Sequence, residues 1–317
     1  MSRYYLGVDG GQSSTTALIG GDDGNVLGMG RSGPCNHVSG AERRTKFLRV
    51  LTECVSAACT AAGLSAGHKE FEAACLGFSG GAADKRDLVE EHFHCRRLSV
   101  THDALIALAG ATAGSPGIIT IAGTGSMAFG RNTQGQTARA GGWGYIFGDE
   151  GGGFDLARQA LRAALRAEEG WGPPTTLHSK LLQATGAANA NDLLHRFYTP
   201  DYSRPQIAAL SKLVEEAARE GDSQANDILQ AAAQQLALLA AAVRRQLFSE
   251  CERVSVAWIG GVFSCDALRE RFRLLLELDD GVQCGPPQMA PAAGALLEAY
   301  RSAELAVTLK NCPEMEK

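Results

Sequence analysis

Short apolar runs alternate with longer amphipathic stretches along the whole chain. In its first third, β-branched and apolar runs predict strands, and stretches with apolar positions three or four residues apart predict helices. The predicted strands lie at 3–8, 15–20, 26–30, 73–78 and 97–101, and the predicted helices at 40–62, 85–92 and 104–111. The polar turn Asp22-Asp23-Gly24-Asn25 joins the second and third strands as a hairpin.

The same order of elements returns in the rest of the chain. Strands are predicted at 117–122, 127–131 and 137–140, helices starting at 154, 175, 189, 204 and 223, and then a strand at 254–259 and helices at 266–276 and 290–306. Residues 132–135 form the turn of a second hairpin. A strand, strand, strand, helix, strand, helix order that occurs twice predicts an α/β fold of two similar domains flanking a cleft.

A stretch of small residues followed by a proline, at 113–116, marks the predicted domain boundary. We expect a first domain over 1–115 and a second over 116–289. The closing helix is expected to pack back on the first domain, so residues 290–317 are assigned to it.

Composition limits the class of partner. With 45% hydrophobic and 21% charged residues among 317, the chain is an ordinary globular protein, and its formal net charge of −5 gives no basic surface for nucleic acid or anionic membranes. The most apolar helical stretch, 236–243, is too short to span a bilayer, and residues 1–5 lead into a strand without a signal-peptide pattern. We therefore expect a cytoplasmic protein whose partners are small molecules.

The cysteines do not suggest a metal or disulfide framework. There are nine, and none forms the CxxC spacing of a zinc or iron–sulfur site. Reduced and mostly buried thiols are expected.

Two glycine turns, each placed between two apolar runs, carry the clearest chemistry. The first is Asp9-Gly10-Gly11-Gln12-Ser13-Ser14, and the second is Gly123-Thr124-Gly125-Ser126. Glycine allows φ values that other residues avoid, so such turns can fold tightly and direct backbone N–H groups at a bulky anion. Phosphate is the natural anion, and two turns from two similar domains are expected to hold one polyphosphate from opposite sides.

Four ordered motifs then make the chain resemble a known family. They are the two turns, the loop Gly141-Gly142-Trp143-Gly144 with Gly148-Asp149-Glu150-Gly151, and the late Ile259-Gly260-Gly261-Val262. Together they resemble the sugar kinase, actin and Hsp70 superfamily, and within it the N-acetylglucosamine kinase and BadF/BadG ATPase family. The resemblance covers nearly the whole chain and implies two actin-like ATPase domains, which are duplicated ribonuclease H-like folds.

The resemblance implies ATP and Mg²⁺ as cofactors. Asp9 would orient Mg²⁺ through water, although an aspartate that only shapes its turn is the alternative. The implied phosphate-binding residues are Gly10, Gly11, Ser13 and Ser14 in the first turn and Gly123, Thr124, Gly125 and Ser126 in the second. The chain departs from the family at Gln12, which adds bulk where relatives commonly carry glycine. It also has no Walker A lysine, so Mg²⁺ and backbone dipoles must neutralise the phosphates.

Asp103 is the implied catalytic base, because it follows a predicted strand and begins a helix where the resembling kinases carry theirs. An ordinary helix N-cap is the alternative from the local sequence alone. The implied sugar contacts are Asn36, Asp103, Gly142, Trp143 and Asp149. For Trp143, a buried anchor of its glycine-rich loop is equally compatible with the sequence.

The resemblance places the nucleoside near the late glycine motif. Gly260 and Gly261 would let the backbone approach adenosine, and Ala218 lies where the family has an adenine contact. The helix predicted over 204–220 is amphipathic, so simple packing explains Ala218 as well.

These residues together predict an ATP-dependent amino sugar kinase that phosphorylates the 6-hydroxyl of N-acetylglucosamine. Glucosamine and N-acetylmuramate remain alternative acceptors on the same scaffold. An ATPase activator of a CoA dehydratase is a remote alternative, because it needs cluster-binding cysteines and positions 96–250 contain none. A noncatalytic sugar sensor is a further alternative, and a homodimer is left open.

Overall fold

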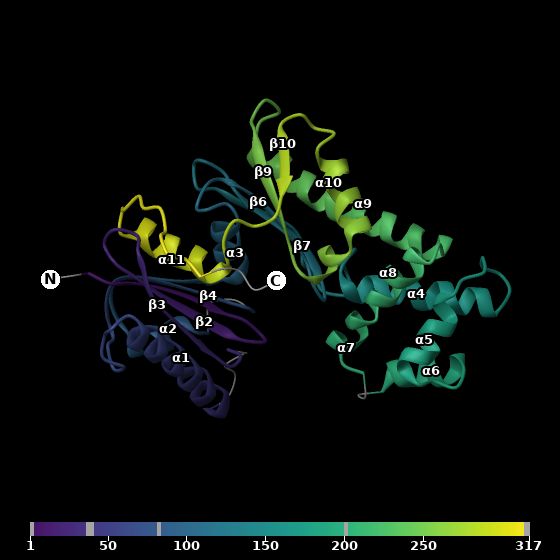
Figure 1. The fold of residues 1–317 in the computed structure, drawn as a ribbon, viewed down its shortest axis with the longest axis horizontal. Helices are drawn as coiled ribbons and strands as arrows, with labels where there is room; N and C mark the ends of the chain where they lie inside the picture. Colours follow the sequence, from purple (N-terminus) through teal and green to yellow (C-terminus); the bar gives the residue numbers. More distant parts are fainter. Residues whose placement is uncertain (1–2, 36–40, 81–83, 200–201, 314–317) are drawn as a thin grey trace. The chain divides into compact units, whose positions relative to one another are not determined.

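The computed structural model describes residues 3–35, 41–80, 84–199 and 202–313 (Figure 1). The chain forms two compact units, the first of Met1–Ser115 with Pro287–Lys317 and the second of Pro116–Pro286. Each unit is built on a five-stranded sheet, ordered β3-β2-β1-β4-β5 in unit 1 and β8-β7-β6-β9-β10 in unit 2. In both sheets the first three strands in the chain pair antiparallel and the later two join in parallel. The predicted α/β fold of two similar domains is therefore confirmed.

Unit 1 follows the predicted order of elements. Its elements are β1 (Tyr5–Gly10), β2 (Thr15–Gly20), β3 (Val26–Ser32), α1 (Ala41–Ala61), β4 (Glu70–Phe78), α2 (Arg86–His92), β5 (His94–His102), α3 (Asp103–Ala111) and α11 (Pro291–Ser302). Successive residues of β1 face opposite sides of the sheet. Leu6 and Val8 lie in the core that α1 covers, whereas Tyr5 lies in the core that α11 covers. Figure 1 shows the sheet between these two helices.

Unit 2 carries more helices between its third and fourth strands. Its elements are β6 (Gly117–Ala122), β7 (Ser126–Arg131), β8 (Thr137–Gly141), α4 (Gly153–Glu168), α5 (Leu177–Thr185), α6 (Ala190–Tyr198), α7 (Arg204–Ala209), α8 (Ser211–Arg219), α9 (Ser223–Leu247), β9 (Val254–Ile259), the 3₁₀ turn η1 (Gly261–Ser264), α10 (Asp266–Leu276) and β10 (Val282–Gly285). The apolar face of α9 belongs to the same core as β6 and β9. Among the described residues, no helix combines the length and the apolar character that crossing a membrane requires.

In unit 2 one predicted helix is wrong and one strand is missed. The helix predicted over 204–220 is broken at Leu210, whose N–H donates 3.0 Å to the carbonyl of Ile207, three residues back. Strand β10 was not predicted, because four residues with one apolar β-branched side chain give no periodic signal. Its backbone is ordered by the parallel ladder with β9, which only the fold supplies.

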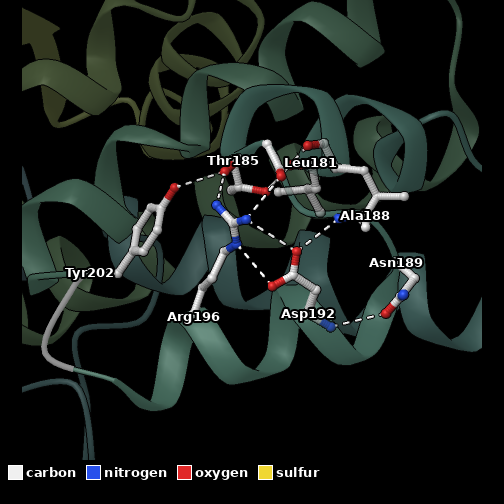
Figure 2. Close-up of polar contacts among 9 residues, drawn as sticks. Leu181, Thr185, Ala188, Asn189, Asp192, Arg196 and Tyr202 are labelled. Carbon is white, nitrogen blue, oxygen red and sulfur yellow. Dashed lines mark hydrogen bonds and ion pairs between the residues drawn. The ribbon is translucent and has the colours of Figure 1, made fainter.

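Arg196 fastens α6 to the end of α5 (Figure 2). Its guanidinium donates 2.5 Å to the carbonyl of Thr185 and lies 3.1 Å from the carboxylate of Asp192. Asp192 in turn accepts from the N–H of Ala188 at 2.9 Å, and Asn189 caps the helix by accepting from the N–H of Asp192 at 3.0 Å. A backbone carbonyl at the end of α5 and backbone N–H groups around the start of α6 thus find hydrogen-bond partners in the side chains of α6 and its cap.

Glycines let α11 approach its neighbours at backbone distance. A Cβ on Gly294 would overlap the carbonyl oxygen of Ile106 and the amide nitrogen of Gly110, both on α3. A Cβ on Gly7, in β1, would overlap the amide nitrogen of Leu296. These clashes involve backbone atoms, which cannot move aside as a flexible side chain would.

We expect Gly294→Ala to destabilise unit 1. Alanine favours a helix by about 1 kcal/mol over glycine, but the backbone clash is expected to outweigh this and lower the free energy of unfolding by about 2 kcal/mol or more. Chemical denaturation followed by circular dichroism measures the change. Gly67→Ala is the matched control, because a Cβ there meets no atom within 4 Å. Equal stability of Gly294→Ala and the parent chain would contradict the packing described for α11.

Candidate active site

The in-register parallel ladders of unit 1 bring two carboxylates to one edge of the sheet. Asp9 pairs with Gly77 across β1 and β4, and Gly77 pairs with Thr101 across β4 and β5. The chain therefore leaves all three strands at the same level, and Ser79 and Asp103 follow β4 and β5 there. Ligands of parallel α/β sheets commonly bind at this carboxyl edge.

Asp9 is a buried carboxylate within electrostatic range of Asp103. Burial raises the pKa of Asp9 to about 6, and repulsion by the Asp103 carboxylate adds to the shift. Both effects disfavour the ionised form of Asp9. A cation bound next to Asp9 would relieve both effects.

Asp103 begins α3, but it is not the N-cap of that helix. The cap is His102, whose Nδ1 accepts from the N–H of Leu105 at 3.2 Å. Asp103 instead accepts from the hydroxyl of Ser79 at 2.8 Å through Oδ2 and from the N–H of Ala104 at 2.9 Å through Oδ1. The N-cap alternative for Asp103 is therefore wrong, and the carboxylate is held by two donors while remaining partly exposed.

The first glycine turn is closed by its own backbone. The N–H of Gly11 donates 2.9 Å to the carbonyl of Ser14, and the carbonyl of Gly11 accepts from the N–H of Cys35 at 3.1 Å. Residues 12–14, which include the predicted phosphate ligands Ser13 and Ser14, are exposed. The turn thus presents its hydroxyl side chains to solvent next to Asp9.

The predicted reason for glycine in the two turns is wrong. None of these four glycines has a φ in the left-handed region: Gly10, Gly11, Gly123 and Gly125. Close contact instead requires glycine at two of these positions, Gly10 and Gly125. A Cβ on Gly10 would overlap the ring of Phe78, and one on Gly125 would overlap the carboxylate of Asp149.

Backbone hydrogen bonds from the start of α4 hold the second turn in place. Gly123 donates 2.9 Å to the carbonyl of Gly125, and the N–H of Gly153 donates 2.7 Å to the carbonyl of Gly123. The N–H of Phe154 donates 3.0 Å to the carbonyl of Thr124. A Cβ on Gly123 would meet no atom within 4 Å, so the turn is open on the side to which that Cβ would point.

The two hydroxyl residues of the second turn differ. Ser126 is buried and its hydroxyl donates 2.6 Å to the carbonyl of Glu150, so its proton is already engaged within the protein. Within the part of the chain that the structure describes, the Thr124 side chain has no hydrogen-bond partner. Gly142 also reaches this turn, because its N–H donates 3.0 Å to the carbonyl of Ser126.

Asp149 and Trp143 have opposite environments. Asp149 is buried beside Gly125, has a φ of 63°, and lies 3.6 Å from the guanidinium of Arg204. Trp143 is 67% exposed, and the guanidinium of Arg139 lies 4.8 Å from its ring centroid. The alternative of Trp143 as a buried loop anchor is therefore wrong, whereas an exposed aromatic face is suited to contact a ligand.

The late glycine motif lies against the second turn. Gly260 has a φ of 111°, and a Cβ there would overlap the carbonyl oxygen of Ala122, so only glycine fits. Gly261 has open space where its Cβ would be. Ala218 is half-buried on α8 and packs against the core of unit 2, which accords with the packing alternative.

A pocket of about 410 Å³ adjoins the first turn in unit 1. It is lined by Gln12, Pro34, Cys35, Arg43, Lys46, Phe47 and Ser79. We call it the α1 pocket, because three of its residues lie on that helix. The predicted sugar ligand Asn36 follows Cys35 in the sequence and lies outside the described residues.

Sequence reasoning also missed Lys85. Its side chain is fully buried, with Nζ 3.2 Å from the carboxylate of Asp84 and 5.8 Å from the ring centroid of Phe78. A single lysine in a polar stretch has no pattern that predicts burial. Its burial depends on its position next to Phe78, the last residue of β4.

No preformed metal cluster of protein side chains occurs in the described ranges. Within these residues, no group of three or more His, Cys, Asp and Glu side chains is suited to hold an ion. All nine cysteines are free thiols. Asp9 nevertheless fits Mg²⁺, which commonly binds through one or two carboxylates, several waters and the phosphates of its substrate.

Comparison with known proteins identifies related chains over nearly the full length. The sequence model of the BadF/BadG/BcrA/BcrD ATPase family matches residues 6–299. An N-acetylmuramic acid/N-acetylglucosamine kinase of Clostridium acetobutylicum is 35% identical over 283 residues, which is 87% of this chain and 91% of that protein. An N-acetyl-D-glucosamine kinase of Dictyostelium discoideum is 30% identical over 279 residues, covering 82% and 85%. A crystal structure from Chromobacterium violaceum, described as a candidate N-acetylglucosamine kinase, superposes with a TM-score of 0.73 at 30% identity and covers 93% of this chain and 98% of its own.

We expect Asp9→Asn to stabilise the ligand-free protein at alkaline pH. In the folded state the pKa of Asp9 is about 6, against a usual value of 3.8. Its protonated form is therefore favoured by folding, and the stability associated with it is present below pH 3.8 and lost as the pH rises through 6. The amide avoids this loss, so the gain is expected to reach about 3 kcal/mol at pH 8 and to vanish near pH 4.

Chemical denaturation at a series of pH values measures this difference. Asp87→Asn is the matched control, since Asp87 is an exposed aspartate of the same unit. Parallel stability profiles of Asp9→Asn and the parent chain would show that Asp9 is not held in the fold at a raised pKa.

Proposed function

This chain belongs to the BadF/BadG/BcrA/BcrD ATPase family, and we propose that it transfers the γ-phosphate of ATP to the 6-hydroxyl of N-acetylglucosamine. Its relatives over most of the chain are amino sugar kinases, so the coarser assignment is an ATP-dependent amino sugar kinase with two actin-like ATPase domains. The observation that supports the proposal most is the placement of Asp103. It lies at the carboxyl edge of the first sheet, beside the phosphate turn and within electrostatic range of Asp9.

Asp103 is proposed to act as the general base. The sugar oxygen forms a bond to the γ-phosphorus, the bond from that phosphorus to the oxygen of the β-phosphate breaks, ADP leaves, and the hydroxyl proton passes to the Asp103 carboxylate. The hydrogen bonds from Ser79 and the N–H of Ala104 fix the direction of the carboxylate. Positioning of this kind is the main contribution that a protein makes to phosphoryl transfer.

The two glycine turns are proposed to bind the phosphates. In unit 1, the exposed Ser13 and Ser14 supply hydroxyls beside Asp9, and in unit 2 the unpartnered hydroxyl of Thr124 does so. Ser126 has a supporting role in this proposal, because its hydroxyl holds Glu150. Asp9 would hold Mg²⁺, which when bound supplies positive charge to the transferring phosphoryl group. Gly260 and Gly261 are proposed to let adenosine approach the backbone, and Ala218, half-buried on α8, is the proposed adenine contact.

The other proposed sugar contacts are those that the family resemblance implies. Asn36 is retained from the family resemblance, and the exposed Trp143 with Gly142 offers an aromatic face and an open backbone. Asp149 is proposed as a sugar ligand whose orientation is fixed by Arg204 and by its contact with Gly125.

We expect amino sugars to stimulate ADP release from Mg²⁺-ATP. The panel is N-acetylglucosamine, N-acetylmuramic acid, glucosamine, N-acetylmannosamine and glucose, and a coupled assay measures ADP for each. N-acetylglucosamine is expected to give a kcat/KM at least about tenfold above that of glucose, because one or two polar contacts to the acetamido group are worth about that much. A panel in which no sugar raises ADP release above the rate without acceptor would refute the kinase assignment.

We expect Asp103→Asn to lower kcat by about a hundredfold or more, because the amide cannot accept the hydroxyl proton. Binding of ATP and of N-acetylglucosamine, measured by calorimetry, is expected to change little, since the amide keeps the shape of the side chain. Asp87→Asn again serves as the control and is expected to leave kcat unchanged. Near-normal turnover by Asp103→Asn would remove Asp103 from the role of base.

A further inference from the structure

The α1 pocket carries positive charge next to the proposed base. Lys46 and Phe47 follow Arg43 on α1 by three and four residues, so each is a neighbour of Arg43 on the helix surface. Phe47 is buried with its ring 5.2 Å from that of Phe78, which anchors this part of α1 to the sheet. Arg43 and Lys46 are exposed residues, and both line the pocket.

The charge of Lys46 acts on the buried thiol of Cys35, which also lines the pocket. Burial raises the pKa of the Cys35 thiol, while the charges of Lys85 and Lys46 oppose that rise. Asp9 acts on the same thiol in the opposite direction. The pocket lies near the carboxyl edge of the sheet, because a Cβ on Gly10, the residue after Asp9, would lie 3.3 Å from the Cβ of Cys35.

Ser79 connects the pocket to the reacting group. The side chain lines the pocket, and its hydroxyl donates 2.8 Å to the carboxylate of Asp103. A sugar whose hydroxyl is bound at Asp103 therefore has the pocket next to it. Among the described residues that line the pocket, two are cationic and none is acidic.

We propose that the α1 pocket receives an anionic substituent of the amino sugar, with Arg43 and Lys46 as specificity-determining residues for acceptors that carry a carboxylate. The inference rests on the proposed kinase function. Guanidinium and ammonium groups bind carboxylates through charge-assisted hydrogen bonds, which are about twice as strong as neutral ones. The same charges disfavour an acceptor with an ammonium group, such as glucosamine.

The pocket is large enough for this role. Its volume of about 410 Å³ exceeds what a short carboxyalkyl ether requires, and its wall combines the apolar Pro34 and Phe47 with polar groups. Apolar contact to the alkyl part and ionic contact to the carboxylate suit a lactyl ether on a sugar ring. N-acetylmuramic acid, which is N-acetylglucosamine with such an ether, is therefore the probe.

The experiment compares kcat/KM for N-acetylmuramic acid and N-acetylglucosamine at saturating Mg²⁺-ATP. We expect the parent enzyme to phosphorylate both sugars. In Arg43→Gln and Lys46→Gln, the ratio of kcat/KM for N-acetylmuramic acid to that for N-acetylglucosamine is expected to fall about tenfold or more, mainly through KM. Arg44→Gln is the matched control, since Arg44 is an exposed arginine of the same helix turn that does not line the pocket, and its ratio is expected to equal that of the parent.

Ionic strength gives a second measurement. KM for N-acetylmuramic acid is expected to rise with added salt more steeply than KM for N-acetylglucosamine, because salt screens attraction between partly exposed charges. The difference between the two sugars is expected to disappear in the double variant of Arg43→Gln with Lys46→Gln. Circular dichroism and thermal unfolding of each variant show that the fold is retained.

Three outcomes would overturn the inference in distinguishable ways. Phosphorylation of N-acetylglucosamine without N-acetylmuramic acid would refute the carboxylate site and leave the kinase function intact. An unchanged ratio accompanied by a higher KM for ATP in the variants would assign the two cations to the nucleotide instead. A parent enzyme that is stimulated by no sugar would refute the proposed function and this inference with it.

Discussion

Burial of one carboxylate near another at the end of a parallel ladder is the constraint on which the proposed chemistry of unit 1 depends. Three strands in register bring Asp9 and Asp103 to one edge of the sheet, and the loops that follow have to be arranged around two carboxylates. Ser79 donates to one of them, and burial keeps the other at a raised pKa. The ligand-free protein thus retains an unfavourable concentration of negative charge, which a cation can relieve. Stability is reduced at the point where the chemistry is proposed, as is common for functional sites.

The same sheet order supports a different arrangement in unit 2. There the loop after the first strand is held by backbone hydrogen bonds from the start of α4, and glycines at 125 and 260 permit the close contacts. Asp149, which lies beside Gly125, pairs with Arg204 at 3.6 Å. One topology therefore carries a carboxylate centre in one unit and an open turn made mainly of backbone in the other, a division that suits an acceptor base and a phosphate cradle.

The sequence predicted the fold well where local pattern and tertiary pairing agree. The strands at 15–20, 117–122 and 254–259 have the observed bounds, because their apolar, β-branched runs are buried and end at glycine or polar turns. Strand β10 and the break at Leu210 could not be predicted, since a neighbouring ladder and a local change of hydrogen bonding decide them.

Within the site, motif order placed the two turns and Asp103 on their elements. The capping role of His102, the exposure of Trp143 and the buried Lys85 have no local signal, because each depends on which element packs against it. From the sequence alone, Arg43 and Lys46 are ordinary solvated residues of a helix, because only the folded structure shows the pocket beside them.

The return of α11 to unit 1 has a further consequence for the order in which the two units fold during synthesis. Unit 2 is one continuous stretch of chain, whereas the face of the first sheet that carries Tyr5 lacks α11, which supplies much of its covering layer, until residues 291–302 have been synthesised. The half of the protein that is translated first is therefore the half that completes its core last.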